Sequence, residues 1–168
     1  MIRTLGDKTP RVAETAWVSE FAYVVGDVEI GELCSIWPGV TIRADGDDKI
    51  VLGDYVNVQE GSVIHGSGLI IEHHVTIGHG VVVHGDFIGE GSLLGNNCTF
   101  LNRSSLGKHC LIAANSVVLS GIKIPDNSFV TGVPGKIKRQ ISEEQRANML
   151  NNANHLAEAK ELFRKSGL

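Results

Sequence analysis

Two histidines and an arginine, which together suit a metal site, occupy equivalent positions of a repeat in this sequence. Arg43, His65 and His84 each come directly after an apolar residue of that repeat, and His79 lies two residues after another. Three neutral imidazoles with one position left open are the ligand set of a catalytic zinc site. Zinc in such a site lowers the pKa of a water molecule toward neutrality. The spacing therefore predicts a metal site of His65, His79 and His84 beside Arg43.

The repeat that carries these residues has a period of six. Neither a helix nor an isolated strand has this period, and a fixed short period indicates a solenoid. Three six-residue units per coil predict six to seven coils, with parallel strands stacked about 4.8 Å apart. The spacing changes only after residues 42, 64 and 83. The twenty repeat positions, called the ladder below, are all apolar: Val12, Val18, Val24, Ile30, Ile36, Ile42, Leu52, Val58, Ile64, Ile71, Ile77, Val83, Ile88, Leu94, Phe100, Leu106, Ile112, Val118, Ile124 and Val130.

The ladder also predicts the role of the three cysteines. Cys34, Cys98 and Cys110 each lie two residues before a ladder residue, where nearly every unit has a small side chain. We expect them to face inward, because a buried cysteine packs like a small hydrophobic residue. Their odd number, without metal-ligand spacing, favours a reducing, cytoplasmic location.

The position of His79 favours a site shared between subunits. Arg43, His65 and His84 form one outward column on a single face of the prism, one coil apart. His79 belongs to the preceding face of the coil that carries His84, and five residues with a corner between them span about 15 Å. Packing that face against the histidine face of a neighbour around a threefold axis would form a homotrimer with a site at each interface. The remaining histidines are expected to be solvated or to make local contacts: His73, His74, His109 and His155.

The sequence after the ladder predicts one helix. Residues 131–135 contain two glycines and a proline and suggest a turn, and Ser142 with Gln145 matches a capping box. Gly167 ends the helix, which we expect to lie along its own solenoid or a neighbour's. The predicted domains are a β-helix over residues 1–135 and a helical tail over residues 136–168. The apolar face of the predicted helix is expected to consist of Leu150, Ala153, Leu156, Ala157 and Phe163.

Composition argues against several functional classes. The net charge is −4 and the isoelectric point is about 5.9, so the sequence has no basic footprint for nucleic acid. No stretch approaches the length of a membrane span, and residues 1–10 are polar, without the core of a signal peptide.

Six motifs resemble the γ-class carbonic anhydrase family over residues 10–140. They are GDVEIG at 26–31, SIWPGVTIR at 35–43, NVQ at 57–59, GSVIH at 61–65, VTIGH at 75–79 and VHG at 83–85. The resemblance implies an all-β, left-handed parallel β-helix that forms a homotrimer. It also implies that His65 and His84 of one subunit and His79 of a neighbour bind zinc, or iron or cobalt. The implied reaction is the reversible hydration of CO2 to bicarbonate.

The resemblance assigns roles to four further residues. Arg43 and Asp45 match an ion pair at the subunit interface, and Gln59 matches the residue that hydrogen-bonds the bound hydroxide or bicarbonate. Glu60 stands where the family usually has aspartate. The family prototype's acidic loop with its proton-shuttling glutamate is missing here, and the tail contains no tyrosine. The resemblance therefore implies metal binding more firmly than rapid turnover.

Two other functional classes remain open. One is an acyltransferase or thioesterase that uses acyl-CoA, in which Lys136, Lys138 and Arg139 would meet a phosphate. The other is a trimeric scaffold without catalysis. Measuring bound metal separates the first class from an anhydrase. An acyltransferase of this type needs a single histidine base and no three-histidine array.

Overall fold

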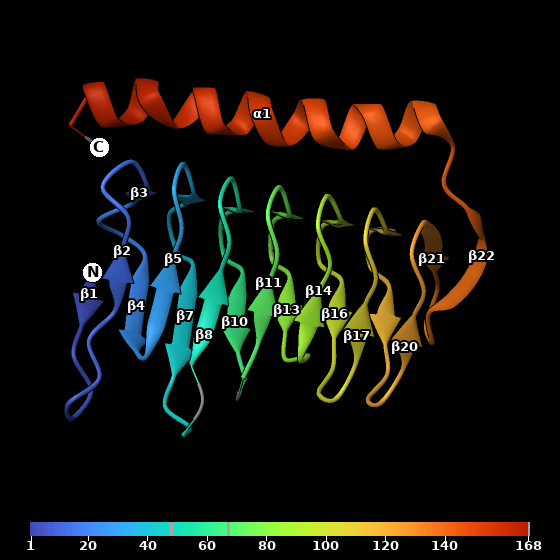
Figure 1. The fold of residues 1–168 in the computed structure, drawn as a ribbon, viewed down its shortest axis with the longest axis horizontal. Coiled ribbons are helices and arrows are strands. Elements are labelled where there is room, and N and C mark those ends of the chain that lie inside the picture. Colours follow the sequence, from blue (N-terminus) through green and yellow to red (C-terminus); the bar gives the residue numbers. More distant parts are fainter. Residues whose placement is uncertain (48, 67, 168) are drawn as a thin grey trace.

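The computed structural model describes residues 1–47, 49–66 and 68–167 and shows a parallel β-solenoid of about seven turns with one long helix (Figure 1). This confirms the β-helix of six to seven coils and the C-terminal helix that the sequence predicts. Each turn consists of three short strands, and every third strand joins the same sheet.

Three sheets form the sides of the prism. The histidine sheet contains β1 (Ile2–Arg3), β4 (Tyr23–Gly26), β7 (Thr41–Ala44), β10 (Val63–His65), β13 (Val82–Val83), β16 (Thr99–Phe100) and β19 (Val117–Val118). The open sheet contains β2 (Arg11–Val12), β5 (Val28–Ile30), β8 (Ile50–Leu52), β11 (Ile70–Ile71), β14 (Phe87–Ile88), β17 (Ser105–Leu106) and β20 (Lys123–Ile124). The helix sheet contains β3 (Trp17–Val18), β6 (Ser35–Ile36), β9 (Asn57–Val58), β12 (Thr76–Ile77), β15 (Leu93–Leu94), β18 (Leu111–Ile112), β21 (Ser128–Thr131) and β22 (Lys136–Gln140).

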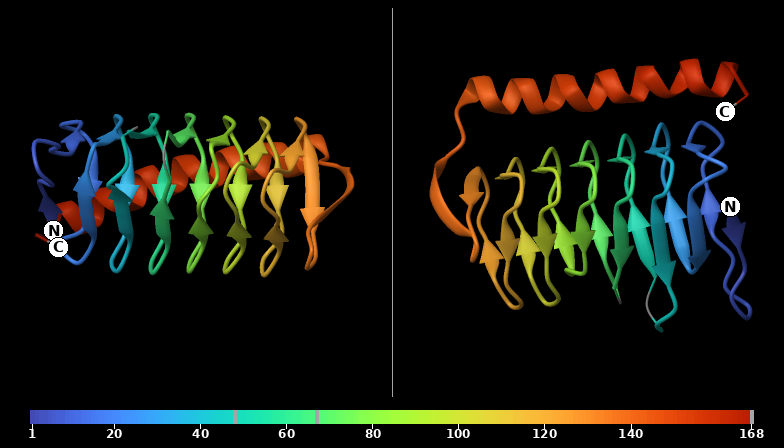
Figure 2. Two further views of the ribbon diagram at one scale, coloured as in Figure 1. Left: turned by 90° about the horizontal axis from the view of Figure 1, so that it is seen from below. Right: turned by 180° about the vertical axis from the view of Figure 1, so that it is seen from behind.

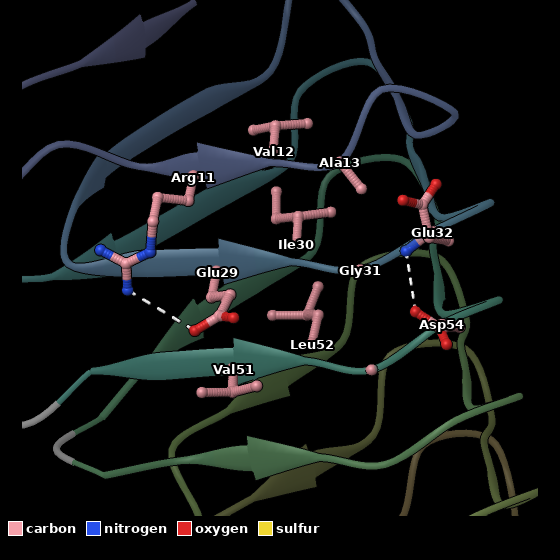
Figure 3. Close-up of a pocket in the computed structure, with 11 residues that line it drawn as sticks. Arg11, Val12, Ala13, Glu29, Ile30, Gly31, Glu32, Val51, Leu52 and Asp54 are labelled. Atoms are coloured by element: carbon pink, nitrogen blue, oxygen red, sulfur yellow. Dashed lines mark hydrogen bonds and ion pairs between the residues drawn. The ribbon is translucent and has the colours of Figure 1, made fainter.

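The ladder residues form the core of the solenoid. Eighteen of the twenty are buried, and only Val12 and Val18, in the first coil, are partly buried. Figure 3 shows the first three strands of the open sheet, on which Val12, Ile30 and Leu52 are aligned in register. The longer interval after Ile42 falls between the end of β7 and the start of β8. The six-residue period therefore places one apolar side chain of each strand inside the prism.

The three cysteines also point into this core, as predicted. Cys34, Cys98 and Cys110 are fully buried free thiols. The Cys34 Sγ donates a hydrogen bond to the carbonyl of Gly53 over 3.0 Å. Burial raises the pKa of Cys34 and Cys98 to about 12 and also raises the pKa of Cys110.

These thiols are expected to resist modification in the folded protein. A thiol reacts as its thiolate, and the raised pKa of Cys34 lowers the thiolate fraction at pH 8 by about a thousandfold. A chromogenic disulfide reagent should therefore label all three thiols rapidly in denaturant and more slowly in buffer, by about a thousandfold for Cys34 and Cys98. Rapid labelling of any one thiol in the native protein would contradict its burial.

The helix α1 (Glu143–Lys165) runs back along the solenoid, so that the two chain termini lie at the same end (Figures 1 and 2). Ser142 accepts a hydrogen bond from the backbone of Gln145, whose side chain in turn bonds the backbone of Ser142, which confirms the capping box. Phe163 contacts Trp17 and Trp37 of the helix sheet, with ring centroids 5.8 and 4.9 Å apart. The helix therefore covers its own solenoid.

The face that α1 buries differs in part from the predicted face. Met149 and Ala153 are buried, whereas Leu150 is exposed. Lys160 is also buried, and its Nζ donates to the backbone carbonyl of Thr15 over 2.8 Å. Residues 149, 153, 156, 160 and 163 follow a 4-3-4-3 spacing, and Leu150 lies about 100° away from residue 149 around the helix. Lys160 was not predicted to be buried, because a charged residue does not count toward an apolar pattern.

Lys136–Gln140, which was predicted to be part of the helical tail, forms the strand β22. β22 pairs with β21 in antiparallel orientation, after a turn over residues 132–135. The division into two domains at residue 135 stays a prediction. No helix in the described ranges is long and apolar enough to cross a membrane.

Candidate functional site

The predicted column of Arg43, His65 and His84 lies on the histidine sheet. Arg43 on β7 is in register with His65 on β10, and His84 directly follows the β13 residue that pairs with Ile64. The His65 Nδ1 and the His84 Nε2 lie 2.8 Å apart, and their ring centroids are 4.7 Å apart. Two imidazole nitrogens therefore converge on one point at the surface of the sheet.

Asp45 contacts His65 through the ring nitrogen that does not face His84. Its Oδ1 lies 3.0 Å from the His65 Nε2, and its Oδ2 contacts the Arg43 Nη1. The hydrogen bond with His65, and then the positive charge of Arg43, lower the pKa of the Asp45 carboxyl. A carboxylate on one ring nitrogen orients a histidine and leaves its other nitrogen free as a ligand. The resemblance implies that Arg43 and Asp45 pair at a subunit interface, and in this structure they pair within one chain.

A second cluster lies at the corner where the helix sheet meets the histidine sheet. His79 follows β12, and its Nδ1 lies 2.8 Å from the Glu60 Oε2. Gln59 and Trp37 lie beside them, and together with Leu156 of α1 these residues line a cavity of about 160 Å³. We call Gln59, Glu60 and His79 the corner cluster. Since Glu60 occupies Nδ1, the Nε2 of His79 is the nitrogen left for a ligand.

The seven predicted site residues thus fall into two groups on one chain. Arg43, Asp45, His65 and His84 make one set of contacts, and Gln59, Glu60 and His79 make another. Within the described chain, no group of three or more His, Cys, Asp or Glu side chains is arranged to hold a metal ion. Each group supplies only part of a three-histidine ligand set.

One detail of the predicted packing was wrong. The sequence predicts that the face carrying His79 packs against a neighbour, but α1 of the same chain contacts β6 and β9 on that face. Ser35, Asn57 and Thr76, which point outward from it, are buried. The corner cluster stays accessible to another molecule, because the side chains of His79 and Glu60 are 53% and 46% exposed.

Sequence reasoning missed two residues of the corner cavity. Trp37 directly follows a ladder residue, and this spacing places it outward on the same face as Gln59, but the sequence assigned it no role in the site. Leu156 was assigned to the apolar helix face, but nothing in the sequence set the position of that helix along the solenoid. The partnership of Glu60 with His79 was also missed, because it joins corners of successive coils.

Exposed apolar side chains lie next to the histidine column. Tyr23, Val63 and Val82 are 41%, 39% and 40% exposed, and β-sheet register aligns all three with Thr41. Leu119, farther along the same sheet, is 47% exposed. An apolar stripe of this kind, interrupted by Thr41, marks a surface suited to contact with another protein.

Comparisons with known proteins agree with the repeat and the motifs. Residues 9–44 match the model of the bacterial transferase hexapeptide family (six repeats). The "Probable carbonic anhydrase" of Methanocaldococcus jannaschii is 39% identical over 84% of this chain and 91% of its own length. The "Carbonic anhydrase" of Geobacillus kaustophilus is 37% identical over 86% of this chain and 80% of its own. A solved structure from Bacillus cereus, described as a "putative acetyltransferase", is 33% identical, with a TM-score of 0.94 over 98% of this chain and 96% of its own.

Proposed function

Because the chain belongs to the γ-class carbonic anhydrase family of hexapeptide-repeat proteins, we propose that it catalyses the reversible hydration of CO2 to bicarbonate. The observation that carries this proposal is the convergence of the His65 Nδ1 and the His84 Nε2, which lie 2.8 Å apart. The contact of His65 with Asp45 and the relatives named carbonic anhydrase also support it.

The residues present fit a zinc ion, with iron and cobalt as alternatives. Two ligand nitrogens of a tetrahedral zinc site lie about 3.3 Å apart, so the rings of His65 and His84 would separate by about half an ångström. His79 of a neighbouring subunit would supply the third nitrogen. Asp45 and Glu60 would act as the outer carboxylates that commonly orient zinc-bound histidines.

We assign the neighbouring subunit to a homotrimer. The apolar stripe of Tyr23, Val63 and Val82 lies on the sheet that carries His65 and His84, and burying it would stabilise an interface. The corner cluster is on another edge of the same chain. A rotation that brings one corner against the next stripe closes a ring after three subunits, and it forms three identical sites.

The metal, when bound, supplies Lewis-acid activation of water near neutral pH. The chain's own residues then bind and orient the reactants. Gln59 faces the corner cavity beside His79 and offers both an amide donor and a carbonyl acceptor to the oxygens of CO2 or bicarbonate. Arg43 contacts Asp45, which fixes the ring of His65, and Glu60 fixes the ring of His79.

Proton release is the step for which the chain is least equipped. Among the described residues, Asp45 and Glu60 are the carboxylates in contact with the three histidines, and each is already engaged by an imidazole. We expect the proton to pass to buffer molecules, so turnover should rise with buffer concentration. The location of this reaction is proposed to be the cytoplasm, where the three free thiols would stay reduced.

The test combines elemental analysis with a stopped-flow CO2 hydration assay. We expect one zinc, iron or cobalt ion per chain and a hydration rate that increases with buffer concentration. Protein reconstituted with zinc, with cobalt and anaerobically with iron should be assayed in parallel. Stoichiometric metal with no hydration in any form would contradict the reaction but leave the metal site intact.

The second candidate is acyl transfer or thioester hydrolysis with acyl-CoA. The Bacillus cereus structure described as an acetyltransferase favours it. Of the three basic residues considered for a phosphate, Arg139 already stacks on Phe129 and donates to the Gln145 side chain. Acyl-CoA turnover by protein that binds no metal would support this candidate over the first.

A further inference from the structure

A second hollow lies on the opposite edge of the helix sheet from the corner cluster. It has a volume of about 380 Å³ and lies where three successive corners meet the first turns of α1. Its lining residues are His74, Glu90, Gly91 and His109 from the corners and Arg146 and Leu150 from the helix. None of these residues belongs to the proposed metal site, so the hollow requires its own explanation.

The corners present two imidazoles around a glycine. His74, Gly91 and His109 occupy the same position in successive corners, with φ of 57°, 65° and 54°. Gly91 carries no side chain, and a Cβ there would lie 2.6 Å from the His109 Nδ1. A larger residue at position 91 would therefore displace the His109 ring, and glycine leaves the hollow open between the two histidines.

Two side chains around this hollow, those of His74 and Arg146, carry polar atoms that lack one kind of partner among the described residues. The ring of His74 stacks on Tyr55, with centroids 4.6 Å apart, and its Nδ1 is buried with no partner in the part of the chain described. Arg146 takes part in none of the ion pairs formed by the described residues. A guanidinium carries N–H donors and no acceptor, so this site favours a ligand that brings acceptors.

The nearby carboxylates are already engaged. The Glu90 Oε2 lies 3.3 Å and the Glu72 Oε2 lies 3.7 Å from the Lys108 Nζ. The Glu72 Oε2 also accepts a hydrogen bond from the backbone N–H of Glu90. Asp126 accepts from the Lys108 backbone. Among the described residues, the guanidinium of Arg146 is therefore a charge at this hollow without an ion-pair partner. Burial, and then the positive charge of Arg146, lower the pKa of His109, which favours the neutral form of its ring.

We propose that this hollow binds a small oxyanion, held by the guanidinium of Arg146 and the imidazoles of His74 and His109. A guanidinium fork binds a carboxylate or phosphate through two parallel hydrogen bonds. Leu150 adds an apolar wall that would accommodate a short carbon chain. Organic carboxylates and inorganic phosphate share this chemistry, and the experiment distinguishes them.

The test is a titration followed by NMR of the histidine side chains in the full-length protein. Sodium acetate, sodium butyrate and sodium phosphate are compared with sodium chloride at equal ionic strength. We expect saturable shifts of the His74 and His109 signals. Binding at the proposed metal site would instead shift His65, His79 and His84, so failure of this proposal and failure of the anhydrase proposal give different results.

Matched variants of one helix provide the control. Arg146→Gln should weaken binding about tenfold or more, the loss expected for one charge-assisted hydrogen bond. Arg164→Gln removes the same charge near the other end of α1 and should leave the affinity unchanged. Tighter binding of butyrate than of phosphate would identify an organic carboxylate, and the reverse order would identify phosphate. No saturable shift with any of the three anions, or equal affinity in wild type and Arg146→Gln, would overturn the proposal.

Discussion

Mixed assemblies of His65→Ala and His79→Ala chains are expected to bind metal, whereas each variant alone binds none. In a ring of three subunits, an intact site needs His65 and His84 from one chain and His79 from the next. Chains refolded together in equal amounts combine at random. About one quarter of the interfaces should then have all three histidines, and the mixture should recover about one quarter of the wild-type metal and activity.

Each single variant should be almost inactive in CO2 hydration. Removing one ligand of three prevents the site from holding a metal that activates water, and we expect a loss of at least a thousandfold, or about 4 kcal/mol in activation free energy. Metal content by mass spectrometry and stopped-flow hydration provide the two readouts. His155→Ala, on the exposed side of α1, is the matched control and should retain both.

Two results would contradict the shared site. Full metal content in His79→Ala alone would mean that the histidine column binds metal without a neighbour. Failure of the mixture to recover metal, with wild type refolding normally under the same conditions, would mean that His65 and His79 do not act at one interface.

Phe100→Ala should cause the largest loss of stability of any single core truncation in this chain. Phe100 is the largest fully buried side chain among the described residues, and it lies between the ladder residues Val83 and Val118. Replacing a buried phenylalanine with alanine typically lowers the free energy of unfolding by about 3–5 kcal/mol. Phe21→Ala is the matched control, since Phe21 is 72% exposed and its truncation should change stability by about 0.5 kcal/mol or less.

Gly85 provides a second check on this packing. A Cβ at position 85 would lie 2.3 Å from the Phe100 Cε1, so Gly85→Ala should cost about 1–3 kcal/mol in the wild-type background. In a Phe100→Leu background the ring is absent, and the same change should cost less. Denaturant unfolding of the four proteins gives this coupling energy as a double-mutant cycle. Equal costs in both backgrounds would show that the Phe100 ring does not restrict position 85.

Residues governed by the six-residue period were predicted well. Ile64 and Val83 are buried where the ladder places them, and so His65 and His84 emerge side by side one residue later. The same period correctly assigned Cys98 to the core. A solenoid makes this possible because each coil repeats the one before, so that sequence spacing translates directly into spatial position.

Residues whose partners lie outside the period were not predicted. Lys160 is buried because α1 lies along the helix sheet in one particular register, and a helix of this kind can slide along a repeating surface without any change in its sequence. The contact between Glu60 and His79 depends on the rotamers of two corner side chains. Spacing places both residues at corners but says nothing about which side-chain atoms meet.

The strand β22 has a consequence for solubility. A solenoid built from parallel strands ends in open strand edges, and such an edge can pair with another chain in an extending stack. β22 runs antiparallel to β21 and occupies the terminal edge of the helix sheet. It carries Lys136, Lys138 and Arg139, charges that disfavour the addition of a further strand. The chain thus blocks end-to-end polymerisation at one edge with a segment of its own.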